Sequence, residues 1–567
     1  MTIRPIRAAA FAAILFSALP LSATAEADAG LYLAARQAGF DSDYAAAAQY
    51  FSRALEGDPE NRGLIESALT SYLSLGDIDN AAPLALRQVE LGNPSGNANL
   101  VLLVDATRRS DWQAIFDLLA AGRTVGPLID GLAQAWASLG SGDMGRAIER
   151  FDDIVAAPGL KAFGLYHKAL ALASVGDFES ADAIFSLPAS EGMQRTRRSA
   201  LAHAEVLSQL DRNADAVAML RDVFGADPDP AVDGLLARLT AGERIPYSFA
   251  NSVADGMAEV LYSVAVALGP DADQGIVLYY ARAAEAARPD HADAIILSGQ
   301  MLTEMGQYDI ANSTFARVPA DNPNYYEAEL GRVGALTAAN RMDAAVEVIQ
   351  ALSRNQGTIP LVQATLGDTL RRAGDMQGAN AAYTAALDLY ADDDPVKWYI
   401  FYMRGITFER LGDWPPAEAD FRKALDLRPG EPSVLNYLGY SLVEMQTNLD
   451  EALDMIQEAA AREPENGAII DSLGWVLYRL GRYQEAVPHM ERAAELEPVD
   501  PIVNDHLGDV FWAVGRQNEA RFQWQRALSF GPDDAEAARI RRKLQVGLDV
   551  VLQEEGAAPL GAARDGN

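Results

Sequence analysis

Apolar positions in the last third of the chain follow the spacing of amphipathic helices, and the pattern returns every 34 or 35 residues. Each repeat has a glycine in its first apolar segment, and these glycines are Gly405, Gly439, Gly474 and Gly508. Each repeat ends on a proline, and these prolines are Pro429, Pro464, Pro498 and Pro532. Proline ends a helix because it lacks an N–H donor and clashes with the preceding turn. The pattern therefore predicts pairs of helices.

Small and large residues alternate at fixed places in the second segment of each repeat. The small ones are the alanines Ala417, Ala452, Ala486 and Ala520. Four residues later come the large ones, Phe421, Ile456, Met490 and Trp524. Glycine and alanine let two helices approach closely, and the large side chain then fills the seam beside them. Because no single pair can bury its apolar face alone, we expect the pairs to stack into one continuous core. An irregular all-helical domain with accidental periodicity is the alternative.

The repeat resembles the tetratricopeptide repeat (TPR), a 34-residue helix–turn–helix unit. Its leucine–glycine pair stands at Leu438-Gly439, Leu473-Gly474 and Leu507-Gly508. A large residue follows each glycine after three positions, at Phe408, Leu442, Leu477 and Phe511. Together with weaker copies upstream, the pattern predicts an all-α TPR superhelix, an α-solenoid of about fourteen repeats.

The quality of the repeats divides the chain into segments. Copies are clear in 292–325 and in 360–534, and degenerate before residue 230. The predicted organisation is a cleaved signal peptide (1–25), a degenerate TPR-like solenoid (26–230), an irregular helical junction (231–291), a TPR array (292–534), a capping helix (535–555) with its charges outward, and a disordered tail (556–567).

The junction breaks the repeat register. It contains Gly242, Pro246 and small polar residues before a helical segment, Met257–Leu268. A hinge or partner-specific insertion between two solenoid halves is one interpretation. Simple decay of a repeat is the other, because loops tolerate insertions.

The amino terminus has the layout of a secretory signal. Arg4 and Arg7 precede an apolar stretch, and Ala23-Thr24-Ala25 forms an A-x-A cleavage site. An uncleaved anchor helix is the alternative. The chain has no cysteine, which suits an oxidising compartment. We therefore predict export across the inner membrane into the periplasm, with no transmembrane span in the mature chain.

The formal net charge of −34 restricts the partners. Nucleic acid and anionic lipid both require clustered Lys and Arg. The acidic excess favours basic partners or divalent cations instead. Acidic residues that only keep a long solenoid soluble are an equal alternative.

Motifs for chemistry are missing from the sequence. The five histidines are scattered without metal-ligand spacing, and neither a phosphate-binding loop nor a G-x-S-x-G elbow occurs. The repeats use nearly the whole length. We predict no catalytic residues, no cofactor and no metal site, and hence a protein that is not an enzyme.

The resemblance implies that the first helices of the repeats line a concave groove. In the four clearest repeats it places an aromatic stripe with carboxylates there: Tyr402, Ile406, Glu409, Asn436, Tyr440, Asp471, Trp475, Tyr478, Asp505, Asp509 and Trp512. Aromatic residues are common anchors of interfaces, and carboxylates select basic groups. We therefore expect partner segments with basic and apolar residues. Packing of some of these aromatics between repeats is the alternative.

These features predict a periplasmic scaffold or adaptor that binds proteins in its groove. In layout the chain also resembles the bacterial envelope TPR adaptors of carboxyl-terminal processing proteases, which implies a protease or its substrates as partners. A structural subunit of an envelope assembly or secretion machine is the first alternative. A glycan-binding protein or an enzyme that uses the aromatic stripe is the second.

Overall fold

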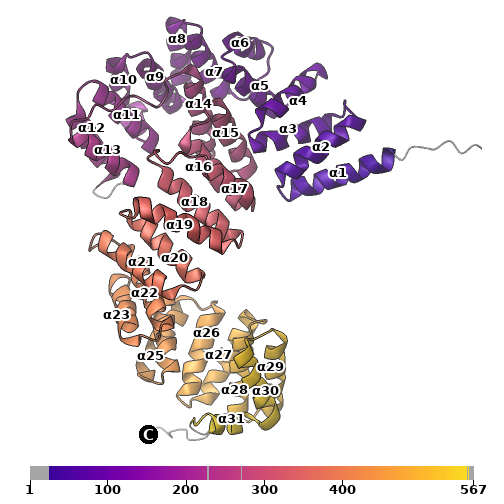
Figure 1. Cartoon of the computed structure of the whole chain (residues 1–567), viewed down its shortest axis with the longest axis vertical. Coiled ribbons are helices and arrows are strands. Elements are labelled where there is room, and N and C mark those ends of the chain that lie inside the picture. The colour runs from indigo at the N-terminus through magenta and orange to yellow at the C-terminus, as the bar shows by residue number, and fades with distance from the viewer. Residues whose placement is uncertain (1–23, 93, 226–228, 270, 558–559, 561–567) are drawn as a thin grey trace, which may run out of the picture. The chain divides into compact units, whose positions relative to one another are not determined.

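The computed structural model describes residues 24–92, 94–225, 229–269, 271–557 and 560. These residues form α-helices joined by short turns, with one short 3-10 helix (Ala189–Glu191) and no strand among them. The predicted all-α solenoid of helix–turn–helix repeats is confirmed (Figure 1). None of the described helices is long and apolar enough to cross a membrane.

The helices group into two compact units, Met1–Leu352 and Ser353–Asn567. The units divide inside helix α19 (Met342–Gln356). Residues 1–23 of the predicted signal peptide lie outside the described residues, as does most of the predicted tail.

The helices of the first unit that precede α19 are α1 (Thr24–Phe40), α2 (Tyr44–Gly57), α3 (Arg62–Leu75), α4 (Ile78–Glu90), α5 (Gly96–Arg108), α6 (Trp112–Ala120), α7 (Pro127–Gly140), α8 (Met144–Ala156), α9 (Lys161–Ser174), α10 (Phe178–Phe185), α11 (Arg197–Gln209), α12 (Asn213–Phe224), α13 (Pro230–Thr240), α14 (Val253–Leu268), α15 (Gln274–Ala287), α16 (Ala292–Glu304), α17 (Tyr308–Phe315) and α18 (Tyr325–Ala338).

The turns within the first hairpins explain where each second helix begins. In the second hairpin, Gly76 takes a left-handed φ of 75°, which costs glycine little. Asp77 follows as the N-cap of α4, and its carboxylate accepts the backbone N–H of Asn80 at 3.1 Å. The same capping arrangement recurs at Asp43, Asp111, Asp143 and Asp177. Local sequence therefore sets these hairpin boundaries even where the repeat motif is degenerate.

Helices α14 and α15 lie on the concave side of the first unit (Figure 1). Helix α14 packs against α5, α7 and α9, and α15 packs against α3 and α5. The approach is close, because a Cβ on Gly256 would lie 2.5 Å from the ring of Trp136 on α7. Both helices are buried on most sides, as expected for helices inside a core. Two helices of the predicted junction thus pack against early hairpins of the first unit.

A buried ion cluster fixes α14 in this position. Glu259 on α14 is 0 % exposed, and its carboxylate contacts the guanidinium of Arg198 and lies 3.1 Å from Nε2 of His291. The Tyr166 hydroxyl donates to Glu259 Oε2 at 3.2 Å. Burial raises the pKa of Glu259, but Arg198 and His291 outweigh it and lower the pKa to about 2. An ionised carboxylate therefore ties α14 to α9, α11 and the start of α16.

One buried group beside this cluster has no hydrogen-bond partner. His167 on α9 is 0 % exposed, and neither of its ring nitrogens is hydrogen-bonded in the described structure. The ring packs edge-on against Trp136 and Tyr166. Burial lowers the pKa of His167 to about 4, although the charge of Glu259 acts in the opposite direction. The imidazole is therefore neutral at pH 7.

Replacing His167 with leucine is expected to raise the free energy of unfolding of the first unit by about 1 kcal/mol at pH 7, because it removes an unsatisfied polar group. The wild-type histidine also binds a proton more tightly when unfolded, with a pKa of 6.5 against about 4 when folded. The free energy of unfolding of the wild-type unit is therefore unaffected by this group above pH 6.5. It falls between pH 6.5 and 4, by at most about 1.4 kcal/mol per pH unit. Urea unfolding measured across this pH range should show that the free energy of unfolding changes less with pH in the variant than in the wild type. An equal pH dependence in the two proteins would contradict this assignment.

The remaining helices belong to the second unit. They are α20 (Pro360–Arg372), α21 (Met376–Leu389), α22 (Lys397–Arg410), α23 (Trp414–Leu427), α24 (Pro432–Glu444), α25 (Leu449–Arg462), α26 (Gly467–Arg479), α27 (Tyr483–Leu496), α28 (Pro501–Ala513), α29 (Gln517–Ser529), α30 (Asp534–Val546) and α31 (Leu548–Glu554).

The seams between these helices match the predicted pattern of small and large residues. Phe421 is 0 % exposed, and its ring would lie 2.7 Å from a Cβ added to Gly405. Met490 stands in the same relation to Gly474, since its Cγ would lie 2.7 Å from the added Cβ. Ile456 and Trp524 are also fully buried. The predicted role of the large residue four positions after each alanine is therefore confirmed.

Replacing Gly474 with leucine is expected to lower the free energy of unfolding of the second unit by about 1–3 kcal/mol or more, because the added side chain overlaps Met490. Thermal unfolding of the variant checks this. Gly334 is a matched control, because it lies within α18 and a Cβ there would meet nothing within 4 Å. A Gly334→Ala variant should therefore unfold close to wild type, and equal effects at both positions would contradict the packing argument.

The carboxy-terminal cap differs from the single predicted helix. It consists of α30 and α31, which divide at Gly547. Gly547 has a φ of 88°, and a Cβ there would lie 2.6 Å from the Trp512 ring. Lys543 was expected to point outward, but it is 0 % exposed. The prediction of an outward charge at Lys543 is wrong, because two carboxylates on α28 bind its ammonium group.

Candidate partner-binding cleft

The predicted groove residues of the first two clear repeats lie on α22 and α24 and are half-buried. Tyr402 packs against the rings of Phe421 and Tyr437, with centroids 6.1 and 6.0 Å apart. Glu409 accepts the Tyr437 hydroxyl at 3.1 Å. Ile406 packs against the same core. These side chains join neighbouring repeats as well as bordering the concave face.

Three rings stack where α26 meets α28. The indole of Trp475 lies 3.9 Å from the imidazole of His506, with 12° between the planes, and 4.8 Å from the phenol of Tyr478, with 13°. The Trp475 N–H donates to Glu444 on α24 at 2.7 Å. Trp475 and Tyr478 are each only 7 % exposed. Neighbouring repeats therefore cover most of both rings.

The carboxylate of Asp471 binds inside the same stack. Its Oδ2 lies 2.9 Å from Nδ1 of His506. Burial alone would lower the pKa of His506, but the Asp471 carboxylate outweighs it and raises the pKa. Asp471 thus stabilises a protonated His506 and is not available to a partner.

Helix α30 supplies the cations for the other two predicted acidic positions. The Lys543 ammonium donates to Asp505 Oδ2 at 2.7 Å and to Asp509 Oδ1 at 2.6 Å. Arg539 Nη1 lies 3.5 Å from Asp509 Oδ2. Burial and the charge of Asp509 raise the pKa of Asp505 in spite of Lys543. Trp512 is also covered, because its N–H donates to Asp549 of α31 at 2.8 Å. The acidic positions on α28 are therefore neutralised by the chain's own carboxy-terminal helices.

Five of the predicted positions line one cleft of about 420 Å³, and they are Tyr440, Trp475, Tyr478, Asp505 and Asp509. The other predicted positions, Tyr402, Ile406, Glu409, Asn436, Asp471 and Trp512, lie outside its lining. The remaining lining residues are Glu444, Arg479, Pro501, Ile502, His506, Glu536, Arg539, Ile540, Leu552 and Glu555. Sequence reasoning missed those on α30 and α31, although the basic run at 539–543 beside an apolar stripe was a usable signal.

The comparison with protein families decides what the repeats are. The model of the tetratricopeptide repeat matches residues 296–357, 365–432, 438–501 and 472–535. These segments are tetratricopeptide repeats. The first segment belongs to the first unit except for its last residues, so the TPR pattern extends across both units.

A curated relative is the TPR repeat-containing protein PA4667 of Pseudomonas aeruginosa. It is 26% identical over 192 residues, which make up 33% of this chain and 31% of the relative. This chain therefore matches about a third of that protein's length.

Two solved structures match this chain. The APC/C hetero-tetramer Cut9–Hcn1 is 16% identical with a TM-score of 0.38, over 91% of this chain and 96% of that one. YrrB, described as a TPR protein with an unusual peptide-binding site, is 19% identical with a TM-score of 0.28, over 35% of this chain and 99% of that one.

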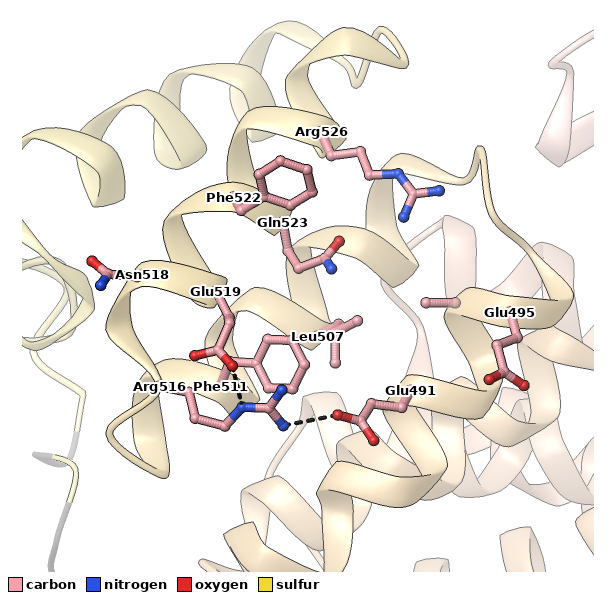
Figure 2. A pocket seen from close by; sticks show the side chains of 11 residues that line it. Glu491, Glu495, Leu507, Phe511, Arg516, Asn518, Glu519, Phe522, Gln523 and Arg526 are labelled. Carbon is pink, nitrogen blue, oxygen red and sulfur yellow. Dashed lines mark hydrogen bonds and ion pairs between the residues drawn. The ribbon is translucent and has the colours of Figure 1, made fainter.

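A second concavity of about 510 Å³ lies between the TPR helices α27, α28 and α29. Figure 2 shows Arg516 beside the ring of Phe511, with ion pairs to Glu491 and Glu519. Phe522 on the rim is 64% exposed. The second helices α27 and α29 provide most of its lining, so it differs in composition from the cleft and serves as a control surface.

The described residues contain no cluster of three or more side chains suited to hold a metal ion. TPR repeats generally form non-enzymatic scaffolds. The geometry of the cleft, with stacked rings, ion pairs and a partly open volume, is suited to holding a side chain of another molecule.

Proposed function

We propose that this protein is a periplasmic scaffold or adaptor that holds segments of partner proteins against the concave face of its second unit. The TPR fold supports a role as a protein–protein interaction scaffold. The observation that carries the proposal is the convergence of Tyr440, Trp475 and Tyr478 on one cleft with the carboxy-terminal helices. Aromatic side chains held rigidly in a concavity lower the ordering cost of binding.

The assignment to the second unit has a structural reason. In the first unit, α14 and α15 occupy the concave side of the early hairpins and are held there by the Glu259 cluster. A partner would have to displace these helices and expose a buried ion cluster. The cleft at α24, α26 and α28 needs no such rearrangement.

The chemistry of the partner is suggested by α30. This helix presents Arg539 and Lys543 to the carboxylates of α28 and buries Ile540 beside them. Helix α30 is therefore a basic and apolar segment of the chain itself that already binds part of the concave surface. Partner segments of the same character are the ones this surface fits, and a substrate handed to an envelope protease would be one such partner.

Replacing Ile502 with lysine is expected to abolish partner capture without unfolding the protein. Ile502 lines the cleft but is 43% exposed, so a positive charge there costs little stability while opposing a basic and apolar ligand. Phe522→Lys is the matched control, because it places the same charge on the second concavity. Crosslinking in cells followed by mass spectrometry reads out both variants, and rising salt should release the partner of the wild type.

A permanent structural subunit that binds through its outer face predicts the reverse. Partners would then be lost with Phe522→Lys and kept with Ile502→Lys. Glycan binding would appear as retention on purified cell-wall polysaccharide, a result that the proposed scaffold excludes.

Export is the remaining part of the proposal. The basic start at Arg4 and Arg7 and the A-x-A site before Glu26 support it. Cell fractionation with amino-terminal sequencing should find a periplasmic chain that starts at Glu26. A chain in the cytoplasm with an intact amino terminus would overturn this part.

A further inference from the structure

We infer that the cleft between α24, α26, α28 and the terminal helices takes a single cationic side chain of the partner, an arginine or a lysine flanked by aliphatic residues. This inference rests on the proposed scaffold function and specifies what that function recognises. Helix α30 neutralises only part of the cleft. Its two cations bind Asp505 and Asp509 and leave other carboxylates of the cleft without a cation.

The charges that line the cleft are unbalanced. Five carboxylates and two guanidinium groups line it, and Lys543 adds one buried cation below. His506 also lines the cleft, but its charge is balanced by Asp471, which lies outside the lining. Glu444 accepts only the indole N–H of Trp475, and neither Glu444 nor Glu536 forms an ion pair with a described residue. Burial is the main cause of the raised pKa of the neighbouring Tyr440 hydroxyl, and both carboxylates add to it. The negative excess is complementary to one added cation.

A buried acceptor supports the same ligand. Asp509 is 1 % exposed and lines the cleft, and its Oδ2 accepts no hydrogen bond from any described residue. Its other oxygen, Oδ1, already accepts from the Lys543 ammonium at 2.6 Å and from the Trp524 N–H at 2.9 Å. Arg539 Nη1 lies 3.5 Å from Oδ2, and the Nε of Arg539 pairs with Glu555 at 2.8 Å. Buried carboxylate oxygens normally have a donor. A guanidinium or ammonium group entering the cleft could supply it.

The aromatic residues of the cleft favour a cation with an apolar stem. Tyr440, Trp475 and Tyr478 line it together with Ile502 and Leu552. Cations bind to aromatic faces, and the methylene stems of Arg and Lys bury well on apolar surface. The guanidinium of Arg479 already lies 5.9 Å from the Trp475 ring, which shows the same contact within the chain. An anionic side chain would face the carboxylate excess instead.

The test uses two short probes and the full mature chain. Acetyl-Leu-Arg-Leu-amide carries the cation, and the citrulline peptide of the same sequence is its neutral isostere. We expect isothermal titration to show the arginine peptide binding at least tenfold more tightly than the citrulline peptide. The preference should shrink as salt is raised, since part of it is electrostatic.

Substitutions in the cleft test whether the arginine peptide binds there. Glu444→Gln combined with Glu536→Gln should weaken the arginine peptide at least tenfold and leave the citrulline peptide unchanged. The glutamine at 444 can still accept the Trp475 N–H, so the aromatic stack is retained. Glu495→Gln in the second concavity is the matched control and should have no effect.

Equal binding of the two peptides, stronger binding of a glutamate peptide, or no binding of the arginine peptide would each overturn the inference. The two proposals fail separately. If Ile502→Lys loses its cellular partner while the peptides bind equally, the scaffold role stands and the cation specificity falls. If Ile502→Lys keeps every partner, the scaffold role of this cleft falls whatever the peptides do.

Discussion

Replacing Glu259 with alanine is expected to lower the free energy of unfolding of the first unit by about 3–5 kcal/mol. The substitution removes one partner of a buried ion pair and leaves Arg198, 19% exposed in its side chain, without the carboxylate that neutralises it. His291 and Tyr166 lose the same acceptor. Because α14 lies inside the first unit, the damage should extend to the helices packed around it.

Hydrogen exchange resolved by peptide measures this effect best, because a solenoid of two units need not unfold in one step. Exchange should rise in α7, α9, α11, α14 and α15, and little in the second unit. Asp290→Ala is the control, because Asp290 pairs with Arg288 but is 72% exposed in its side chain, where a pair contributes little. Similar exchange in both variants would show that the cluster does not hold α14.

The Glu259 carboxylate also determines how the free energy of unfolding of the first unit changes at low pH. The pKa of Glu259 is about 2 in the folded chain against 4.5 when unfolded. A lowered carboxyl pKa gives stability that is complete above pH 4.5 and is lost as the pH falls toward 2. The Glu259→Ala variant should therefore lack this component of acid unfolding, while His167 accounts for the loss at higher pH.

Replacing Trp475 with alanine should cost about 3–5 kcal/mol in the second unit and also remove binding at the cleft. Its indole is 7 % exposed and stacks on His506 and Tyr478, so the substitution leaves a cavity between two repeats. Thermal unfolding and peptide titration are the two measurements. A variant with wild-type stability and lost binding would mean that the ring faces solvent.

Phe522→Ala is the control for this prediction. It removes an aromatic ring of similar size that is 64% exposed, so its free energy of unfolding should stay within about 0.5 kcal/mol of wild type. The contrast separates loss of packing from loss of a surface contact. Neither substitution changes the glycine and alanine positions of the repeat motif.

The repeat pattern predicted the fold because its causes are local. A glycine opposite a large residue, such as Gly405 with Phe421, needs only the correct spacing along two adjacent helices. The N-cap aspartates, such as Asp77, likewise act on a backbone N–H three residues away. Such contacts recur with the period of the sequence, so reading the period was sufficient.

The groove was predicted less completely because exposure depends on distant residues. Trp475 occupies a position that the repeat register directs to the concave face, yet Glu444 of α24 and His506 of α28 cover it. Asp509 was expected to await a basic partner, and Lys543 reaches it from 34 residues away. The repeat register predicts the direction in which a side chain points, but not which distant residues pack against it.

By itself, the sequence determined the helix pairs, their stacking into a TPR solenoid and the small-to-large seams, since each depends on neighbours within one or two repeats. Only the tertiary structure decided that α14 and α15 enter the concave side of the first unit, and that α30 neutralises the acids of α28. The apolar period of a helix is the same whether it covers a core from outside or lies within it. Burial and charge pairing between distant segments are therefore settled by the packing of the folded chain.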